Sequence, residues 1–127
     1  MKSILIVDDD RDLFESMKIV LEAEGYRVSW ATSGKEALSM ARACRPDLMI
    51  LDVMMESDDE GFQVTYAMKQ DASLSGIPIV MVTSVASRTG FSFDRERDQD
   101  FLPVNEYLEK PVDPRVLVDK VRENLGR

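Results

Sequence analysis

The segment SILIVDDDRD, residues 3–12, joins an unbroken apolar run directly to three consecutive carboxylates. An apolar run without alternation, such as Ile4–Val7, is typical of a strand that is buried on both faces of a parallel sheet. Asp8, Asp9 and Asp10 follow it without a spacer. Two unit charges about 4 Å apart repel each other by roughly 4 kcal/mol at an effective dielectric near 20. A cation must offset this repulsion, or the side chains must separate into water.

The rest of the chain alternates between short apolar runs and longer stretches with helical periodicity. The short runs predict strands over residues 3–7, 26–31, 47–52, 78–83 and 105–111. The longer stretches predict helices over residues 11–25, 33–44, 61–71 and 113–126. This alternation indicates an α/β fold, in which a three-layer, doubly wound, five-stranded parallel sheet carries helices on both faces. With 127 residues the chain is expected to form one domain, residues 1–127.

The segment between Thr83 and Tyr107 departs from this alternation. Its centre, residues 94–100, is polar at every position, so that it has no apolar stripe to pack on a sheet. Pro103 prevents a helix from continuing toward the fifth strand. We therefore expect the fourth helix to be short or irregular. Residues 86–103 are then either a solvated loop without a role or a surface for partner recognition.

Composition excludes several classes of function. The chain has no histidine, which excludes a histidine base, zinc ligand or phosphocarrier within it. A net charge of −8 argues against nonspecific binding to DNA or anionic lipid. No apolar stretch approaches the roughly 20 residues of a membrane span, and no signal peptide is recognisable, so we expect a cytoplasmic protein without membrane contact. The single cysteine, Cys44, is expected to be a small buried thiol in a helix.

Polar residues follow several of the predicted strands at the point where each strand ends. In an open parallel sheet, ligands bind beyond the carboxyl ends of the strands. The residues at these ends are Asp8, Asp9, Asp52, Thr83, Ser84 and Lys110. Each of them alone is typical of an acidic turn, a helix cap or a surface lysine. Together they place three acids, two hydroxyls and one ammonium at the same edge, which indicates a functional site.

This arrangement resembles the receiver domain of bacterial two-component response regulators, including the chemotaxis receivers. The motifs ILIVDDD, LMILDVMM, IVMVTS and YLEKP carry the resemblance, in this order, over nearly all of residues 1–127. It implies a flavodoxin-like sheet with the strand order 2-1-3-4-5. It also implies a signalling domain that catalyses only its own phosphorylation and dephosphorylation, and is not an enzyme with external substrates.

The resemblance implies a role for each residue that matches a motif. Asp52 is the implied phosphoacceptor, which takes a phosphoryl group from a histidine kinase. Thr83 is implied to bind a phosphoryl oxygen and to act as the switch hydroxyl, and Lys110 is implied to pair with the phosphoryl group. Tyr107 occupies the place of the switch aromatic residue.

A divalent cation is the cofactor that the resemblance implies. Asp8, Asp9, Asp52 and the backbone carbonyl of Met54 are the implied ligands of Mg²⁺ or Mn²⁺. Magnesium prefers hard oxygen ligands in octahedral geometry and retains several waters. Such an ion would offset the repulsion between the acids that follow the first strand.

The implied partners are proteins. They are a sensor histidine kinase or phosphotransfer protein, which supplies the phosphoryl group, and an output protein that is not identified; direct nucleic acid binding by this chain is not expected. The fourth helix, the fifth strand and the final helix form the face that partners contact in the family, and this face can also join two copies as a homodimer. The chain stops at Arg127, shortly after its last predicted helix. Both a receiver that stands alone and a part of a longer regulator fit this end.

Two features depart from the family pattern. Glu56 stands where the family usually has proline, and one extra residue precedes Gly61, within an acidic run, residues 56–60, that we expect to form a solvated turn. The stretch from Thr83 to Lys110 is also several residues longer than in typical members, so that the face contacted by partners is expected to be unusual.

Three other functions remain open from the sequence. A pseudo-receiver would bind partners without being phosphorylated. An aspartyl-phosphate phosphatase would need a second aspartate two positions after Asp52, where this chain has Met54. A flavodoxin-like cofactor carrier would need a phosphate-binding loop after the first strand, where no glycine-rich or hydroxyl-rich loop is present.

Overall fold

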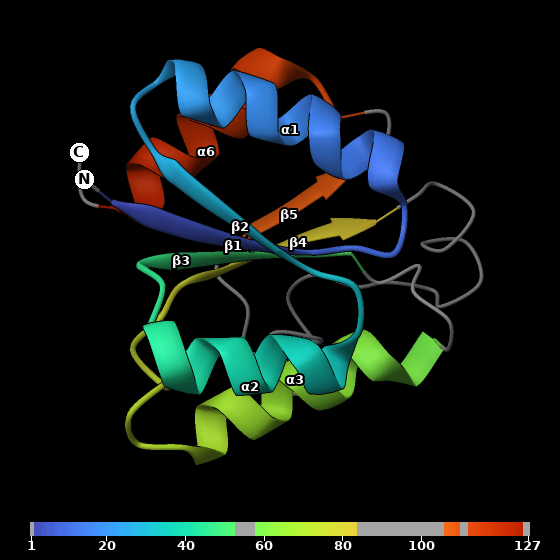
Figure 1. The fold of residues 1–127 in the computed structure, drawn as a ribbon, viewed down its shortest axis with the longest axis vertical. Coiled ribbons are helices and arrows are strands. Elements are labelled where there is room, and N and C mark those ends of the chain that lie inside the picture. The colour runs from blue at the N-terminus through green and yellow to red at the C-terminus, as the bar shows by residue number, and fades with distance from the viewer. Residues whose placement is uncertain (1, 53–57, 84–105, 110–111, 126–127) are drawn as a thin grey trace.

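A five-stranded parallel sheet with the order β2-β1-β3-β4-β5 forms the centre of the molecule (Figure 1). The computed structural model describes residues 2–52, 58–83, 106–109 and 112–125. The strands are β1 (Ser3–Val7), β2 (Arg27–Ala31), β3 (Leu48–Asp52), β4 (Ile79–Thr83) and β5 (Glu106–Glu109). The predicted doubly wound sheet and its strand order are therefore confirmed. The expected irregular fourth helix falls on residues 84–105, which lie outside the described residues.

Helices cover both faces of the sheet. The described helices are α1 (Arg11–Ala23), α2 (Gly34–Cys44), α3 (Asp58–Gln70) and α6 (Pro114–Asn124). Figure 1 shows α1 and α6 on one face and α2 and α3 on the other, which gives the three layers predicted from the sequence. No helix in the described part of the chain is both long enough and apolar enough to cross a membrane.

The sheet separates two apolar cores. Along β1, Ile4 and Ile6 pack toward α1 and α6, whereas Leu5 and Val7 pack toward α2 and α3. Side chains alternate between the two faces of a strand, so a strand covered on both sides must be apolar at every position. β3 is buried along its whole length, including Asp52 at its end. Full burial of one aliphatic side chain of these strands stabilises the fold by about 1.5–3 kcal/mol.

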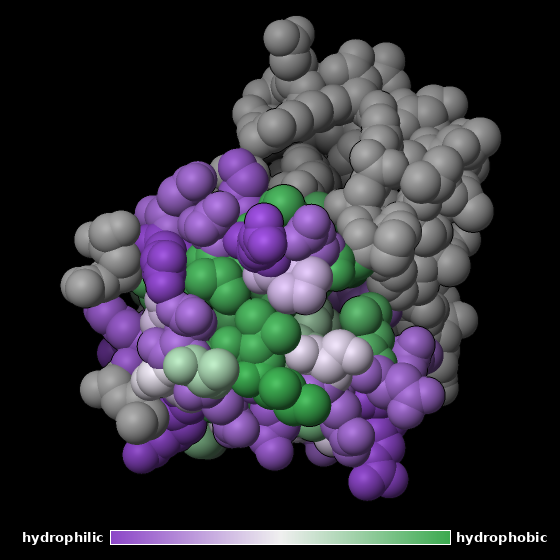
Figure 2. All heavy atoms as spheres, turned by 90° about the horizontal axis from the view of Figure 1, so that it is seen from above, coloured by the Kyte–Doolittle hydropathy of each residue, from purple (hydrophilic) through white to green (hydrophobic). Residues whose placement is uncertain are grey.

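The face formed by α1 and α6 has an apolar centre bordered by hydrophilic side chains (Figure 2). Phe14 and Leu21 of α1 belong to the same buried cluster as Leu117 of α6. At the end of this seam, the guanidinium of Arg122 donates a hydrogen bond to the carboxylate of Glu24. Helices α1 and α6 therefore pack on each other through apolar side chains, and one ion pair lies at the margin of this contact.

Local signals in the sequence account for several helix ends. Gly25 has φ = +93°, the left-handed conformation that favours glycine, directly after the C-cap of α1. The hydroxyl of Ser33, the N-cap of α2, accepts a hydrogen bond from the backbone N–H of Glu36, as in a capping box. The carboxylate of Glu36 reaches back to the backbone N–H of Thr32. Asp113 caps α6 by accepting from the backbone N–H of Arg115.

Two predictions from the sequence are wrong. Cys44 is exposed and not buried, because it is the last residue of α2 and lies beyond the buried stripe of Ala37 and Ala41. Helix α3 begins at Asp58, before the predicted start at Gly61, so that the second part of the acidic run lies in the first helical turn. Acidic residues are favourable there because they complement the positive end of the helix dipole, a preference that apolar periodicity does not detect.

Candidate functional site

Three acids meet at the carboxyl ends of β1 and β3. Asp8 follows β1 directly and Asp52 is the last residue of β3. The strands pair Val7 with Leu51, so that one further step along the register brings Asp8 beside Asp52. Each of Asp8, Asp9 and Asp52 offers a carboxylate oxygen, and these oxygens all lie within 4.8 Å of one another. Asp8 and Asp52 are 0% and 2% exposed, whereas Asp9 is exposed.

Hydrogen bonds hold Asp8 in place from two sides. Its backbone N–H donates to the carbonyl of Ala31 at 3.0 Å. Its backbone carbonyl accepts a hydrogen bond from the indole N–H of Trp30 at 2.8 Å. Its Oδ1 accepts from the backbone N–H of Asp10 at 2.8 Å. The end of β2 and the start of α1 therefore both fix this residue.

Asp10, the third acid of the segment 3–12, caps a helix and is not part of the group formed by Asp8, Asp9 and Asp52. It is the N-cap of α1, and its Oδ1 accepts from the backbone N–H groups of Asp12 and Leu13 at 3.0 and 3.2 Å. These bonds satisfy two of the amide donors that the first turn of a helix leaves open. An aspartate directly before a stretch of helical periodicity is a recognisable N-cap signal. The three consecutive acids thus combine a helix cap, Asp10, with two members of the acidic cluster. This cluster consists of Asp8, Asp9 and Asp52.

The acidic cluster has the chemistry of a site for a hard divalent cation. At 4.8 Å, two carboxylates repel each other by about 3.5 kcal/mol at an effective dielectric of 20, and a cation removes this repulsion. All the ligand atoms that these residues offer are oxygens, which Mg²⁺ and Mn²⁺ prefer. Two carboxylates are buried and one is exposed, which leaves an open side for the waters that magnesium retains. The residues present fit such an ion.

The backbone places two further predicted residues near this edge. β3 and β4 pair Asp52 with Val82, so that Thr83 ends β4 one step beyond the level of Asp52. Tyr107 lies on β5, where it pairs with Met81. Thr83 and Tyr107 therefore belong to neighbouring strands and are separated by two positions in register. Lys110, Met54 and Ser84, the other predicted residues of the site, lie outside the described residues, as does the segment 86–103.

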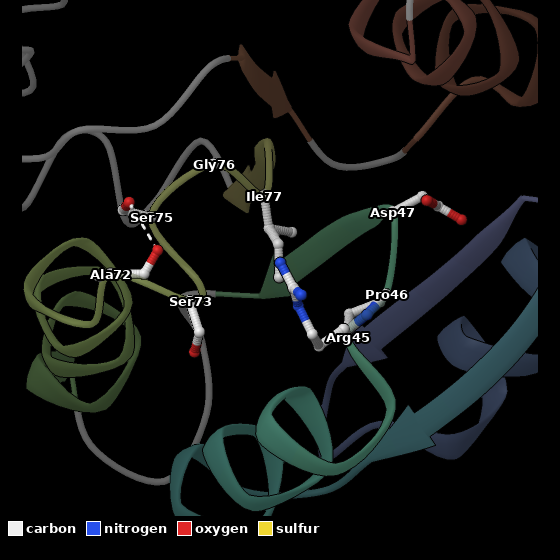
Figure 3. Close-up of a pocket in the computed structure, with 8 residues that line it drawn as sticks. All are labelled: Arg45, Pro46, Asp47, Ala72, Ser73, Ser75, Gly76 and Ile77. Carbon is white, nitrogen blue, oxygen red and sulfur yellow. Dashed lines mark hydrogen bonds between the residues drawn. The ribbon is translucent and has the colours of Figure 1, made fainter.

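A pocket of about 600 Å³ lies at the opposite edge of the sheet. It is lined by Arg45, Pro46, Asp47, Ala72, Ser73, Ser75, Gly76 and Ile77, which belong to the loops after α2 and α3. Figure 3 shows the Arg45 side chain directed from the first loop toward Ile77 on the second. These loops precede β3 and β4, so the pocket lies about one strand length, roughly 13 Å, from the acidic cluster. The hollow and the cluster of acids are therefore separate features.

The turn beside this pocket is stabilised by Asp71. Its carboxylate accepts hydrogen bonds from the hydroxyl and the backbone N–H of Ser73 and from the guanidinium of Arg42. The Ser73 bonds, with a further contribution from Arg42, hold the pKa of Asp71 below its ordinary value of 3.8. The bond with Arg42 joins α2 to the turn that follows α3.

Comparisons with known proteins agree with the geometry. The family model of the response regulator receiver domain matches residues 4–122. The chain is 37% identical over 124 residues to the DNA-binding response regulator MtrA of Mycobacterium tuberculosis, and this match covers 98% of the chain but about half of MtrA. It is 31% identical to Protein PilH of Pseudomonas aeruginosa over 99% of both chains.

Solved structures give the same result. The chemotaxis response regulator CheY4 of Vibrio cholerae superimposes with a TM-score of 0.83 at 27% identity, over 98% of both chains. A CheY-like response regulator receiver domain protein from Methanospirillum hungatei gives 0.82 at 32% identity, over 99% of this chain and 94% of that one. The likeness extends over the full sheet and not only over the motifs.

Proposed function

The chain belongs to the response regulator receiver domain family of two-component systems, and from this premise we propose that Asp52 is its phosphoacceptor. The observation that carries the proposal is the position of this residue. Asp52 ends the central strand β3, is 2% exposed and lies within 4.8 Å of the carboxylate oxygens of Asp8 and Asp9. A carboxylate in this place has its nucleophilic oxygen at the edge where an open parallel sheet binds ligands.

The proposed reaction is a phosphoryl transfer from a phosphohistidine of the partner kinase or phosphotransfer protein. A carboxylate oxygen of Asp52 attacks the phosphorus, the bond between phosphorus and the histidine nitrogen breaks, and an acyl phosphate forms on Asp52. Such transfers depend on positioning and on neutralisation of the charge of the phosphoryl oxygens. Mg²⁺ or Mn²⁺, when bound, supplies part of that neutralisation. The absence of histidine from this chain agrees with a donor on the partner.

Asp8 and Asp9 have different proposed tasks in holding the ion. Asp8 is buried and fixed by three hydrogen bonds, so it supplies a carboxylate oxygen that is already in position. Asp9 is exposed, so it supplies its oxygen from the side that faces water and the incoming donor. The proposal includes the backbone carbonyl of Met54 as a further ligand, by the resemblance of LMILDVMM to the family motif.

The proposed switch uses the neighbouring strands. The Thr83 hydroxyl binds a phosphoryl oxygen and the Lys110 ammonium neutralises charge, while Tyr107 changes its position in response. The pairing of β4 with β3, and of β5 with β4, supports this order of residues. The response would be transmitted to an output protein, or to a second copy in a homodimer, through the face that contains β5 and α6.

This role is one of signalling, in which the chain catalyses only its own phosphorylation and dephosphorylation. A cytoplasmic location would give the chain access to the kinase. The chain spans about half the length of MtrA, so the DNA binding that the name of MtrA states is not transferred to this chain. The net charge of −8 also disfavours nonspecific DNA binding by these 127 residues.

Phosphorylation by acetyl phosphate tests the proposal. The protein is incubated with acetyl phosphate, with and without Mg²⁺, and its intact mass is measured. We expect one phosphoryl adduct on the wild type that requires Mg²⁺ and is lost in Asp52→Asn. Asp47→Asn is the matched control, because Asp47 is an exposed acid that directly precedes the same strand, at the end opposite to Asp52.

Two outcomes would contradict the proposal. An adduct that persists at the wild-type level in Asp52→Asn would place the acceptor elsewhere. A wild type that forms no adduct, but binds a partner, would favour the phosphorylation-independent pseudo-receiver.

A further inference from the structure

Trp30 is in direct contact with the acidic cluster, although it carries no charge. It is the only tryptophan of the chain and is half-buried near the end of β2. Its indole N–H donates a 2.8 Å hydrogen bond to the backbone carbonyl of Asp8. That carbonyl belongs to the peptide group that joins Asp8 to Asp9, the two acids that follow β1. The indole is therefore hydrogen-bonded to the peptide group that joins Asp8 to Asp9.

The peptide group transmits this contact to Asp9. A trans peptide is planar, so fixing the direction of its carbonyl also fixes the direction of the following N–H and the position of the next Cα. The N–H of Asp8 is held by the carbonyl of Ala31 at 3.0 Å. The peptide groups on both sides of Asp8 are thus tied to the end of β2. The exposed Asp9 side chain starts from a backbone that the indole has oriented.

The indole ring is itself held in place. Phe14 of α1 stacks on Trp30 with ring centroids 4.5 Å apart and an angle of 7° between the ring planes. Phe14 is buried in the core between the sheet and the helices α1 and α6. Aromatic pairs in such offset or stacked geometry gain energy beyond the burial of their surface. The hydrogen bond therefore comes from a ring with little freedom to turn.

We propose that Trp30 is a positioning residue for the divalent cation site, because its indole N–H sets the orientation of the peptide group between Asp8 and Asp9. This inference rests on the proposed function, which assigns the ion to the acidic cluster. The same contact makes Trp30 a reporter, since binding of an ion to these acids changes the field at an indole that is bonded to their backbone. A phenylalanine in its place would pack on Phe14 but would donate no hydrogen bond.

Removal of the N–H alone tests the proposal most sharply. Because Trp30 is the only tryptophan, a tryptophan auxotroph can replace it with 3-benzothienylalanine, in which sulfur stands in place of the N–H group. The affinity for Mn²⁺ is measured from the electron paramagnetic resonance signal of the free ion, and the affinity for Mg²⁺ by calorimetry. We expect ion binding to weaken by about 3- to 10-fold, because the Asp8–Asp9 peptide loses an orientation that one hydrogen bond fixes, and this factor corresponds to the free energy of about one such bond. Trp30→Phe should show a loss at least as large.

Two controls separate positioning from general stability. Tyr26→Phe removes a donor from an aromatic residue that directly precedes β2, at the end far from the acids, and should leave ion affinity unchanged. In urea unfolding without metal, the benzothienyl protein should lose no more stability than one hydrogen bond contributes, because the stacked bicyclic ring is retained. In the wild type, saturation with Mg²⁺ should change the fluorescence of Trp30.

The outcomes distinguish this inference from the proposed function. If the benzothienyl protein binds ions as tightly as the wild type while Asp9→Asn does not, Trp30 has no positioning role and the ion site stands. Unchanged ion affinity with reduced stability would leave Trp30 as a packing residue. A wild type that binds neither ion would overturn both proposals, and a fluorescence that does not respond to a bound ion would overturn the reporter role.

Discussion

Replacement of Asp9 by asparagine should stabilise the metal-free protein and at the same time weaken ion binding. The carboxylate oxygens of Asp8, Asp9 and Asp52 lie within 4.8 Å of one another. At this distance a pair of charges repels by about 3.5 kcal/mol at an effective dielectric of 20, and by about 0.9 kcal/mol in water. Asp9 is exposed, so its repulsion by the two buried acids lies nearer the lower value. We expect the free energy of unfolding to rise by about 1–2 kcal/mol.

The ion should offset this difference in stability. A ligand that binds only the native state at 100 times its dissociation constant adds about 2.7 kcal/mol to the free energy of unfolding. Asparagine offers a neutral oxygen in place of a charged one, so the variant should bind Mg²⁺ at least tenfold more weakly. The stabilisation that Mg²⁺ gives should therefore be clearly smaller in Asp9→Asn than in the wild type.

The assay is urea unfolding followed by circular dichroism, with EDTA and then with increasing Mg²⁺. Asp119→Asn is the control, because it removes one exposed negative charge from α6, away from the cluster. A metal-free Asp9→Asn protein that is less stable than the wild type would refute the argument from repulsion. Equal stabilisation of both proteins by Mg²⁺ would show that Asp9 does not hold the ion.

Three further predictions concern the elements that surround the site. Asp10→Ala removes the N-cap of α1 and should cost about 1 kcal/mol in urea unfolding, whereas Asp10→Ser should retain most of that stability. Leu21→Ala should cost about 2–5 kcal/mol, because Leu21 is fully buried, while Ile19→Ala on the same helix, where Ile19 is 70% exposed, should cost far less. The lowered pKa of Asp71 means that its contribution to stability is present above its ordinary value of 3.8 and is lost as the pH falls through the lower folded value. Asp71→Asn should therefore be less stable than the wild type at neutral pH, and the difference should shrink below about pH 4 in unfolding measured against pH.

The apolar runs made the sheet predictable, because each strand of a sheet covered on both faces must be apolar throughout. Ile4–Val7 and Leu48–Leu51 follow this rule, and both runs end directly at the acids of the site. The order of the strands came from the resemblance to the family and not from the runs themselves. Helix ends with a clear chemical signal, such as Ser33 and Asp113, were also predictable.

Three features of the structure could not be predicted from the sequence. They depend on contacts between distant parts of the chain, or they lie where the sequence has no periodic signal. Trp30 lies 22 residues from Asp8, and nothing in the sequence indicates that its indole N–H bonds to the carbonyl of that residue. The exposure of Cys44 depends on where α2 ends relative to the sheet, which helical periodicity alone does not determine. The early start of α3 at Asp58 lies in an acidic run without apolar periodicity.

Chemical trapping of the phosphorylated residue identifies the phosphoacceptor directly. The protein is phosphorylated with acetyl phosphate and Mg²⁺, treated with sodium borohydride, which reduces an aspartyl phosphate to homoserine, and digested for tandem mass spectrometry. We predict homoserine at position 52 and at no other aspartate, in an amount that falls when Mg²⁺ is withheld. Homoserine at Asp8, Asp9 or another acid, with residue 52 still aspartate, would show that Asp52 is not the phosphoacceptor.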